Sequence, residues 1–278
     1  AVPRVANIDE SLNVNVSEIR KFISKKTKVI LPVHMLGVSA PMREILALAK
    51  SRNLPVLEDN CEAIGAKYGK EHLGALGDMG AMSFDHGKMI ACGEGGLVLS
   101  QSAPEAKVAR EYHDHGHENN PNLPRGRDSR SRWGFNFRMT EMQAAVAKVQ
   151  LEKLPWMLRE NKKRYDALQS QIKTKFPIRP LPAGSTSTHD TLMLVNLGIA
   201  QRQEIVSILQ GHGIGTKNIP DAMEWHCAAF WDHALDRQTL RHCRKTLEIL
   251  ERCVAIPIWL RRPVGDYSKL GKALEKLA

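Results

Sequence analysis

The chain has 278 residues, a length that predicts about two domains and is ample for a buried core. Hydrophobic residues make up 42% and charged residues 25% of it, which is a globular balance, and no apolar run approaches the ~20 residues that a membrane-spanning helix needs. The net charge is +10, which favours an anionic partner. Aromatic residues are only 5%, so a nucleic-acid stacking platform is not favoured, and a small anionic molecule fits the charge. We therefore expect neither a nucleic-acid nor a membrane partner.

The five cysteines form no CxxC pair, so neither a zinc ribbon nor a disulfide framework is indicated, and a reducing cytoplasmic location is expected. The chain opens with Ala1-Val2-Pro3, without Met and without a signal-peptide pattern, which favours a piece of a longer protein.

The first third of the chain predicts a βαβ unit. A short helix begins near Ser17, a buried strand covers 28–33, a helix covers 41–50, and the next strand, 54–57, ends at Glu58-Asp59. This order predicts a parallel sheet, and ligands of such sheets bind beyond the carboxyl ends of the strands. Asp59 is thus placed where the chemistry of such folds occurs.

The middle of the chain predicts two strands, two helices and a long loop. The strands are 79–84 and 97–99, joined through a turn at 93–96, and a helix at 103–112 precedes a loop at 116–132. Loops of this length in compact domains are usually functional or disordered. Thr140 and Gln143 form a capping box that starts a helix to about Ile172, with an apolar stripe on Met142, Val146, Val149 and Leu154.

The last third predicts a strand at 191–197 and helices at 201–209 and 238–252. The domain change is expected within the long helix or just after it, which divides the chain into 1–155 and 156–278. Lys217, near two glycines, is expected to be a solvated lysine, with contact to an anion as the alternative.

Three local patterns supply groups that pyridoxal phosphate needs. Asp59 at a strand's end can keep the pyridine nitrogen protonated, Lys88 can form a Schiff base, and Ser83 can reach the phosphate. Each group is weak evidence alone. Their order and spacing, followed by a Gly-Glu-Gly-Gly turn and later by His115-Gly116 and Gly134 to Glu141, make the combination specific.

The patterns resemble those of the DegT/DnrJ/EryC1/StrS family of pyridoxal-phosphate-dependent sugar aminotransferases, from residue 1 to about 165 and more faintly beyond. The resemblance implies an α/β fold of type I, aspartate-aminotransferase-like, with a mostly parallel sheet in a large domain and a small α+β C-terminal domain. It implies that Lys88 is the Schiff-base lysine, Asp59 the partner of the pyridine nitrogen and Ser83 a phosphate ligand. Asn136 would reach the cofactor phosphate of the neighbouring subunit, since family active sites lie at a homodimer interface.

The chain departs from the family pattern in two respects. Glu62 occupies the position where the family usually has a cofactor-binding Gln, and a carboxylate there would repel the cofactor's phenolate unless it is protonated or its contact is shifted. The family also has an N-terminal segment, with a Gly-Thr phosphate loop and a stacking aromatic residue, that has no counterpart here. We therefore expect weak or absent cofactor binding by this chain alone.

The segments 83–90 and 113–121 are similar to the branch of the family that makes 8-amino-3,8-dideoxy-manno-octulosonate. This implies a keto-sugar substrate in surface polysaccharide or lipopolysaccharide biosynthesis, with glutamate as the expected amino donor. Basic loop residues would suit an acidic sugar, namely Arg125, Arg127, Arg130 and Arg132. The tentative substrate contacts are His86, His115, Arg132 and His226.

Other functions stay open at this stage. A sugar dehydratase of the same family would have His in place of Lys88, and His86 is two positions out of register. A non-catalytic binding or regulatory protein with the same fold is the third alternative. His113, His115 and His117 alternate on a loop, but without a nearby Cys a metal site is not favoured.

Overall fold

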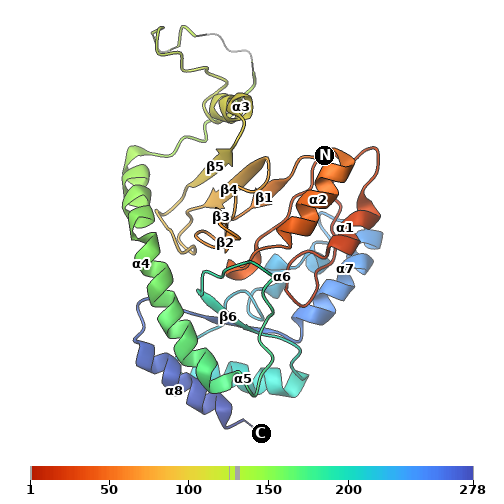
Figure 1. Ribbon diagram of the computed structural model, residues 1–278, viewed down its shortest axis with the longest axis vertical. Coiled ribbons are helices and arrows are strands. Elements are labelled where there is room, and N and C mark those ends of the chain that lie inside the picture. Colours follow the sequence, from red (N-terminus) through yellow and green to blue (C-terminus); the bar gives the residue numbers. More distant parts are fainter. Residues whose placement is uncertain (1, 125, 129–131, 278) are drawn as a thin grey trace.

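Figure 1 shows the chain as a computed structural model, which describes residues 2–124, 126–128 and 132–277. Arg125 and Arg130 of the basic loop lie outside the described residues.

A mixed sheet forms the upper part of the molecule in Figure 1. Its strands are β1 (Leu57–Asp59), β4 (Met79–Ser83) and β5 (Gly96–Ser100), in the order β1-β4-β5. β1 and β4 are parallel, and β5 is antiparallel to β4.

The strand predicted at 28–33 is present only as two isolated parallel bridges, from Ile30 to Val56 and from Val33 to Asp59. They add one extended segment to the sheet beside β1. Only half of it is buried, contrary to the prediction: Ile30 packs against α1 (Val16–Phe22) and α2 (Met42–Arg52), while Val29 and Leu31 are exposed. Alternate side chains of an extended segment point to opposite faces, and only one face is covered.

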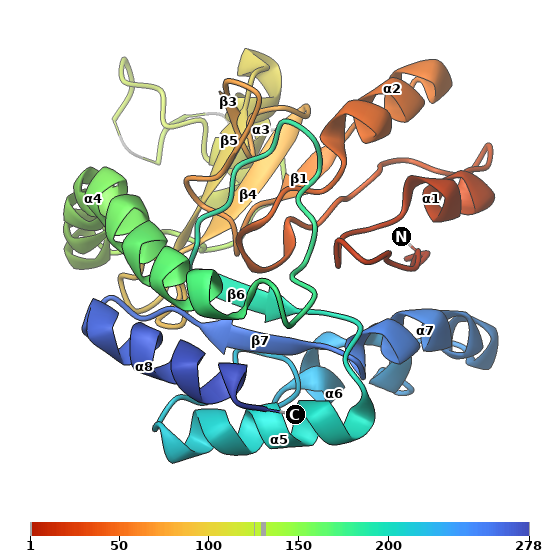
Figure 2. The ribbon, with the colours of Figure 1, turned by 60° about the horizontal axis from the view of Figure 1, so that its bottom comes forward.

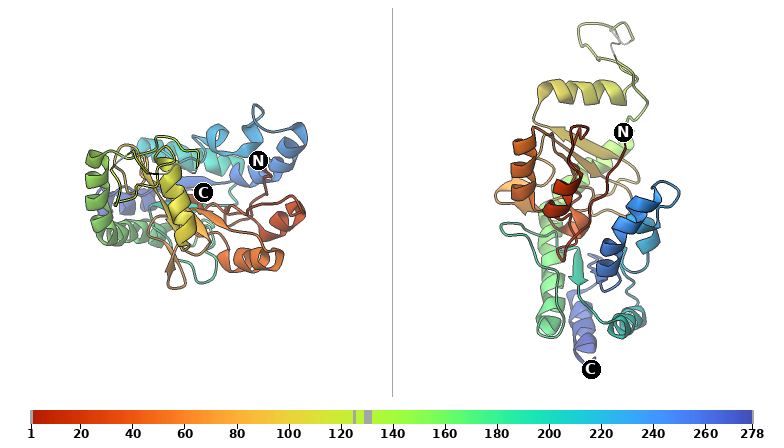
Figure 3. Two further views of the ribbon diagram at one scale, coloured as in Figure 1. Left: turned by 90° about the horizontal axis from the view of Figure 1, so that it is seen from above. Right: turned by 90° about the vertical axis from the view of Figure 1, so that its right-hand side faces the viewer.

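A small hairpin, β2 (Lys67–Tyr68) and β3 (Glu71–His72), follows β1. After β5, α3 (Ala103–His113) lies at one end of the molecule, and the loop beyond it projects outward (Figure 3).

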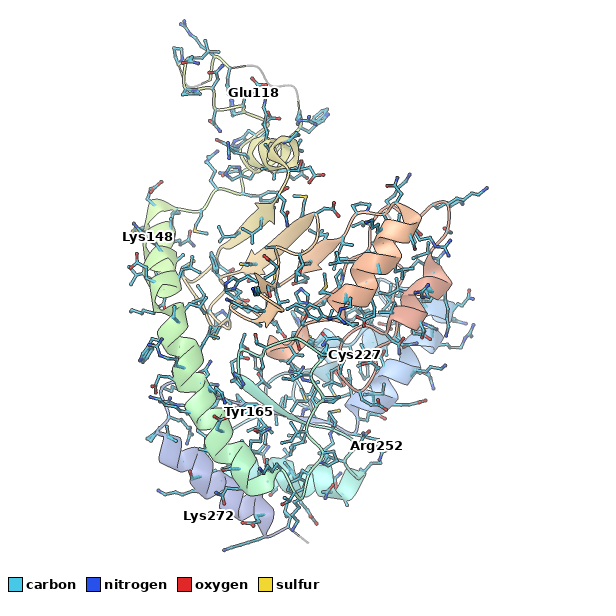
Figure 4. The ribbon with its side chains drawn as sticks, viewed as in Figure 1. Glu118, Lys148, Tyr165, Cys227, Arg252 and Lys272 are labelled. Carbon is cyan, nitrogen blue, oxygen red and sulfur yellow. The ribbon has the colours of Figure 1, made fainter. Side chains whose placement is uncertain are left out.

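The long helix α4 (Glu141–Ile172) runs along one side of the molecule and confirms the predicted capping box of Thr140 and Gln143. Pro155 lies inside this helix. The predicted apolar stripe does not face a core over its first half, because Met142 is 80% exposed and Val146 and Val149 are exposed too. Further along, Tyr165, labelled in Figure 4, packs against the ring of His189 at 5.0 Å between centroids.

The C-terminal part is built on an antiparallel pair, β6 (Thr191–Leu194) and β7 (Val254–Pro257). Figure 2 shows α8 (Val264–Glu275) and α5 (Ile199–Gly211) beside this pair. Together with the end of α4 they form one apolar core that includes Leu168, Leu192, Ile205, Ile256 and Tyr267. β7 and α8 had not been predicted. The remaining helical segments are η1 (Met35–Gly37), α6 (Met223–His226), η2 (Ala228–Phe230) and α7 (Arg237–Leu250).

Among the described residues, no helix combines the length and the hydropathy that crossing a membrane requires. The division at residue 155 stays a prediction, since α4 continues through that position.

Candidate active site

Asp59 and Ser83 stand at the same edge of the mixed sheet. Each is the last residue of its strand, β1 and β4 are parallel, and Asp59 lies opposite Ala81. The backbone of Asp59 is fixed on both sides, because its N–H donates to the carbonyl of Pro32 at 2.9 Å and its carbonyl accepts from the N–H of His34 at 2.9 Å. The side chain of Asp59 accepts from the N–H of Cys61 at 3.0 Å.

Lys88 lies on the loop that joins β4 to β5. Phe84, which is buried, closes this loop: its N–H donates to Gly95 at 2.9 Å, and its carbonyl accepts from Cys92 at 3.0 Å. Gly93 has φ +93° there, a conformation that favours glycine, so the predicted turn is confirmed. The closed loop brings the Lys88 amine back to the strand edge, where Nζ lies 3.4 Å from Glu62 Oε1.

Three donors reach the carboxylate of Glu62. Lys88 Nζ and Asn218 Nδ2 approach Oε1 at 3.4 and 3.2 Å, and the N–H of Leu36 approaches Oε2 at 3.3 Å. Glu62 thus contacts the Lys88 amine and two further segments of the chain, around Leu36 and Asn218.

Asp85 connects Ser83 with Lys88. Its carboxylate lies 3.5 Å from Ser83 Oγ and 3.9 Å from Lys88 Nζ, and it accepts from the N–H of Gly87 at 2.6 Å. The side chain of His86 is 90% exposed and lies 3.7 Å from Asp85. His86 therefore points into solvent beside the site.

A buried hydrogen-bonded pair, His34 and Glu58, lies next to Asp59 at the end of β1. His34 Nε2 lies 2.9 Å from Glu58 Oε2, and both side chains are fully buried. Because the N–H of Ala40 donates to His34 Nδ1 at 3.0 Å, the ring proton is assigned to Nε2, which donates to Glu58. Burial alone would raise the pKa of Glu58, but the bonds from His34 and from backbone amides outweigh it and lower that pKa.

The thiol of Cys61 lies close to three charged groups of the site, namely Asp59, Glu62 and Lys88. Burial and the hydrogen bond to Asp59 raise the pKa of its thiol to about 12. A thiol of this kind is inert at neutral pH.

His115, Arg132 and Asn136 lie together near the end of α3. His115 Nδ1 accepts from the Arg138 guanidinium at 3.0 Å, and Arg132 Nε lies 3.0 Å from Glu111. Asn136 is exposed and forms a bridge with Asp114. The described contacts do not join this group to Lys88 or Asp59.

The alternating histidines have separate partners. His113 bonds the carbonyl of Arg110, and His117 lies 3.1 Å from Asp128. Within the part of the chain that the structure describes, no three His, Cys, Asp or Glu side chains are placed to hold a metal ion.

His226 ends α6 and, together with Asp221 and Trp225, lines an open surface hollow. The segment that leads to α6 also contains Asn218, the partner of Glu62.

Sequence reasoning missed this segment and wrongly expected Lys217 to be solvated. Lys217 Nζ forms a mostly buried ion pair with Asp190 at 2.6 Å. Burial would lower the pKa of Lys217, but the charge of Asp190 outweighs it and raises that pKa. No local signal marks either contact, because the partners lie far apart in the sequence.

The residues at the strand edge fit pyridoxal phosphate by their chemistry. A carboxylate, a hydroxyl and an amine converge there, which are the partners of a pyridine nitrogen, a phosphate and an aldehyde respectively. The stretch from Ser83 to Lys88 folds back on Glu62, so the amine stands near the carboxylate end of β1.

Comparison with known proteins identifies the family of the chain. The model of the DegT/DnrJ/EryC1/StrS aminotransferase family matches residues 1–273. GDP-perosamine synthase of Caulobacter vibrioides is 36% identical over 154 residues, which are 54% of this chain and 39% of that protein. The lipopolysaccharide biosynthesis protein RfbH of Salmonella typhimurium is 27% identical over 242 residues, 78% of this chain and 55% of that protein. The chain thus spans about half the length of these relatives.

Among solved structures, the Helicobacter pylori aminotransferase PseC matches with a TM-score of 0.81 at 18% identity, covering 98% of this chain and 72% of that one. This likeness confirms the predicted fold class.

Proposed function

Because the chain belongs to the DegT/DnrJ/EryC1/StrS aminotransferase family, whose aminotransferases depend on pyridoxal phosphate, we propose that it transfers an amino group from glutamate to a keto sugar. The observation that carries this proposal is the convergence of Asp59, Ser83 and Lys88 at the carboxyl ends of β1 and β4.

Each of these residues has a role that its position supports. Bound pyridoxal phosphate would supply an electron sink for the carbon that loses its proton. Asp59 would hold the proton on the pyridine nitrogen, and Ser83 with nearby backbone amides would bind the phosphate. Lys88 would carry the cofactor and then, as a free amine, move the proton as general base and acid. Glu62 would stand beside the Lys88 amine.

We propose an 8-oxo-3-deoxy-octulosonate as the sugar, in surface polysaccharide or lipopolysaccharide biosynthesis in the cytoplasm. The net charge of +10 supports an acidic substrate. His86, His115, Arg132 and His226 are the proposed substrate contacts. His86 stands at the site itself, next to Asp85. His115, Arg132 and His226 would contact the sugar either from a second subunit or because the sugar is long enough to reach them.

An exposed apolar surface supports a homodimer with shared active sites. It consists of the first half of α4 with Met142, and of the aromatic residues around Asn136, where the Phe135 and Phe137 rings are tilted by 31° with centroids 5.6 Å apart and Trp133 is 91% exposed. Exposed apolar side chains gathered on neighbouring segments are typical of interaction sites. Asn136 lies within it, as the proposed contact with a partner's cofactor phosphate requires.

The assignment of Lys88 is tested by trapping. The chain is mixed with pyridoxal phosphate, reduced with borohydride and digested, because covalent trapping accumulates product even where binding is weak. We expect the pyridoxyl group on Lys88 and a loss of labelling in Lys88→Ala. A full, reducible visible band in Lys88→Ala, carried by another lysine, would overturn the assignment. In the unaltered chain, bleaching of the visible band by glutamate separates a transaminase from a dehydratase.

The homodimer is tested by sedimentation of Met142→Glu against Trp225→Glu, a matched change at an exposed apolar residue outside the surface. We expect only Met142→Glu to shift the chain towards monomer. Equal behaviour of the two variants would refute the interface.

A further inference from the structure

Glu62 is held in place by residues under backbone strain. Leu36, fully buried, has φ +49°, and Asn218 has φ +68°. Left-handed conformations are costly for a leucine, and such strain gathers at functional sites. Both residues use the strained position to donate to the same carboxylate, at 3.3 and 3.2 Å.

Two cationic side chains, the buried Arg179 and the mostly buried Lys217, anchor the segments that carry these donors. Arg179 donates to the carbonyls of Met35 and Leu36 at 2.9 and 2.7 Å, which fixes the segment around Leu36. Lys217, next to Asn218, is tied to Asp190 at 2.6 Å. The carboxylate of Glu62 is thus positioned from the C-terminal half of the chain rather than by its own loop.

We propose that Glu62 is the positioning counter-ion of Lys88 and that Asn218 holds it there, so that the segment before α6 determines how firmly the Lys88 amine is held at the strand edge. This inference deepens the proposed function and relies on it for the role of Lys88. The amine faces two carboxylates, Glu62 at 3.4 Å and Asp85 at 3.9 Å. Opposite charges at these distances attract each other and restrain the amine beside the carboxylates.

Other charged and titratable groups also face the pair. Cys61 interacts with both Lys88 and Glu62, and Lys217 and Arg179 interact with Glu62. The same carboxylate would stabilise a positive charge at Nζ after Lys88 has condensed with an aldehyde. A neutral Gln, the usual family residue here, would do neither.

The test measures the reactivity of Lys88 without any cofactor. Trace acylation with acetic anhydride at pH 8, read by mass spectrometry of the Lys88 peptide, reports how often the amine is released from its carboxylates. We expect Glu62→Gln to raise acylation of Lys88 about fivefold, because the amine is no longer held by the ion pair. Glu71→Gln, the same change on the exposed β3 strand, should leave the acylation of Lys88 unchanged.

Asn218→Gly removes the amide without adding strain, because glycine accepts a positive φ. We expect acylation to rise about threefold, since a mobile Glu62 spends less time at Lys88. The matched control is Asn53→Gly, which removes another left-handed asparagine, φ +50°, at the exposed end of α2. In the double variant Glu62→Gln/Asn218→Gly, acylation should equal that of Glu62→Gln alone, because Asn218 acts only through Glu62.

Unchanged acylation of Lys88 in Glu62→Gln, or additive effects in the double variant, would overturn the inference. Failure of the proposed function gives a different result: pyridoxal phosphate would not be trapped on Lys88 of the unaltered chain, while acylation of Lys88 would still respond to Glu62.

Discussion

Glu58→Gln is expected to destabilise the fold severely, although it changes only one atom. Oε1 of Glu58 accepts from the amides of Leu76 and Gly77 at 2.7 and 2.6 Å. Oε2 accepts from Gly74 at 2.9 Å and from His34 at 2.9 Å. A glutamine keeps one oxygen and turns its NH₂ towards the other two donors. Two charge-assisted bonds are lost, each about 1.5–3 kcal/mol, so we expect a loss of about 3–6 kcal/mol.

The assay is guanidinium unfolding followed by tryptophan fluorescence, with Glu71→Gln as the exposed control. The pH dependence gives a second check. Since the pKa of Glu58 is lowered in the folded chain, its contribution is complete above its unfolded value of about 4.3 and is lost as the pH falls through the folded value. The free energies of unfolding of the unaltered chain and of Glu58→Gln should therefore converge at acid pH. A loss below about 1 kcal/mol at pH 7 would refute the claim that four donors depend on this carboxylate.

Three further changes are expected to act on stability. Lys217→Met should cost about 3 kcal/mol in urea unfolding by leaving Asp190 buried and unpaired, and Asp190→Leu added to it should restore part of this loss. Gly80→Ala should abolish folding as judged by circular dichroism, since its Cβ would lie 2.0 Å from a backbone oxygen, whereas Gly211→Ala, with open space, should fold normally. Thr140→Ala should cost about 1 kcal/mol in thermal unfolding by removing the cap of α4; no change in Tm would refute that contribution.

Features that depend on neighbours in sequence were predictable. The capping box of Thr140 and Gln143 needs only residues three apart, and it starts α4 as expected. The parallel pairing of Ile30 with Val56, which the order strand, helix, strand predicts, and the turn at Gly93 also follow from nearby sequence. The motif around Asp59 and Ser83 identified the strand edge, because a parallel pair brings its carboxyl ends together.

Features that depend on distant partners were not predictable. Lys217 resembles a surface lysine until Asp190 folds against it. The stripe that begins at Met142 has the spacing of a core-facing helix, but nothing in the periodicity states what would cover it. β7 and α8 follow a long helix in a stretch whose short apolar run alone does not distinguish a strand from a loop.

The substitution at Glu62 shows how a departure from a family pattern acquires a physical explanation. By sequence alone, a carboxylate there conflicts with the cofactor's phenolate. In the fold it faces an amine, a side-chain amide and a backbone amide instead. The closest of these donors, Asn218, lies 156 positions away in the chain, so its contribution depends on how the C-terminal half packs. The carboxylate of Glu62 is therefore held by Asn218. Replacing Asn218 should matter only while residue 62 is a carboxylate.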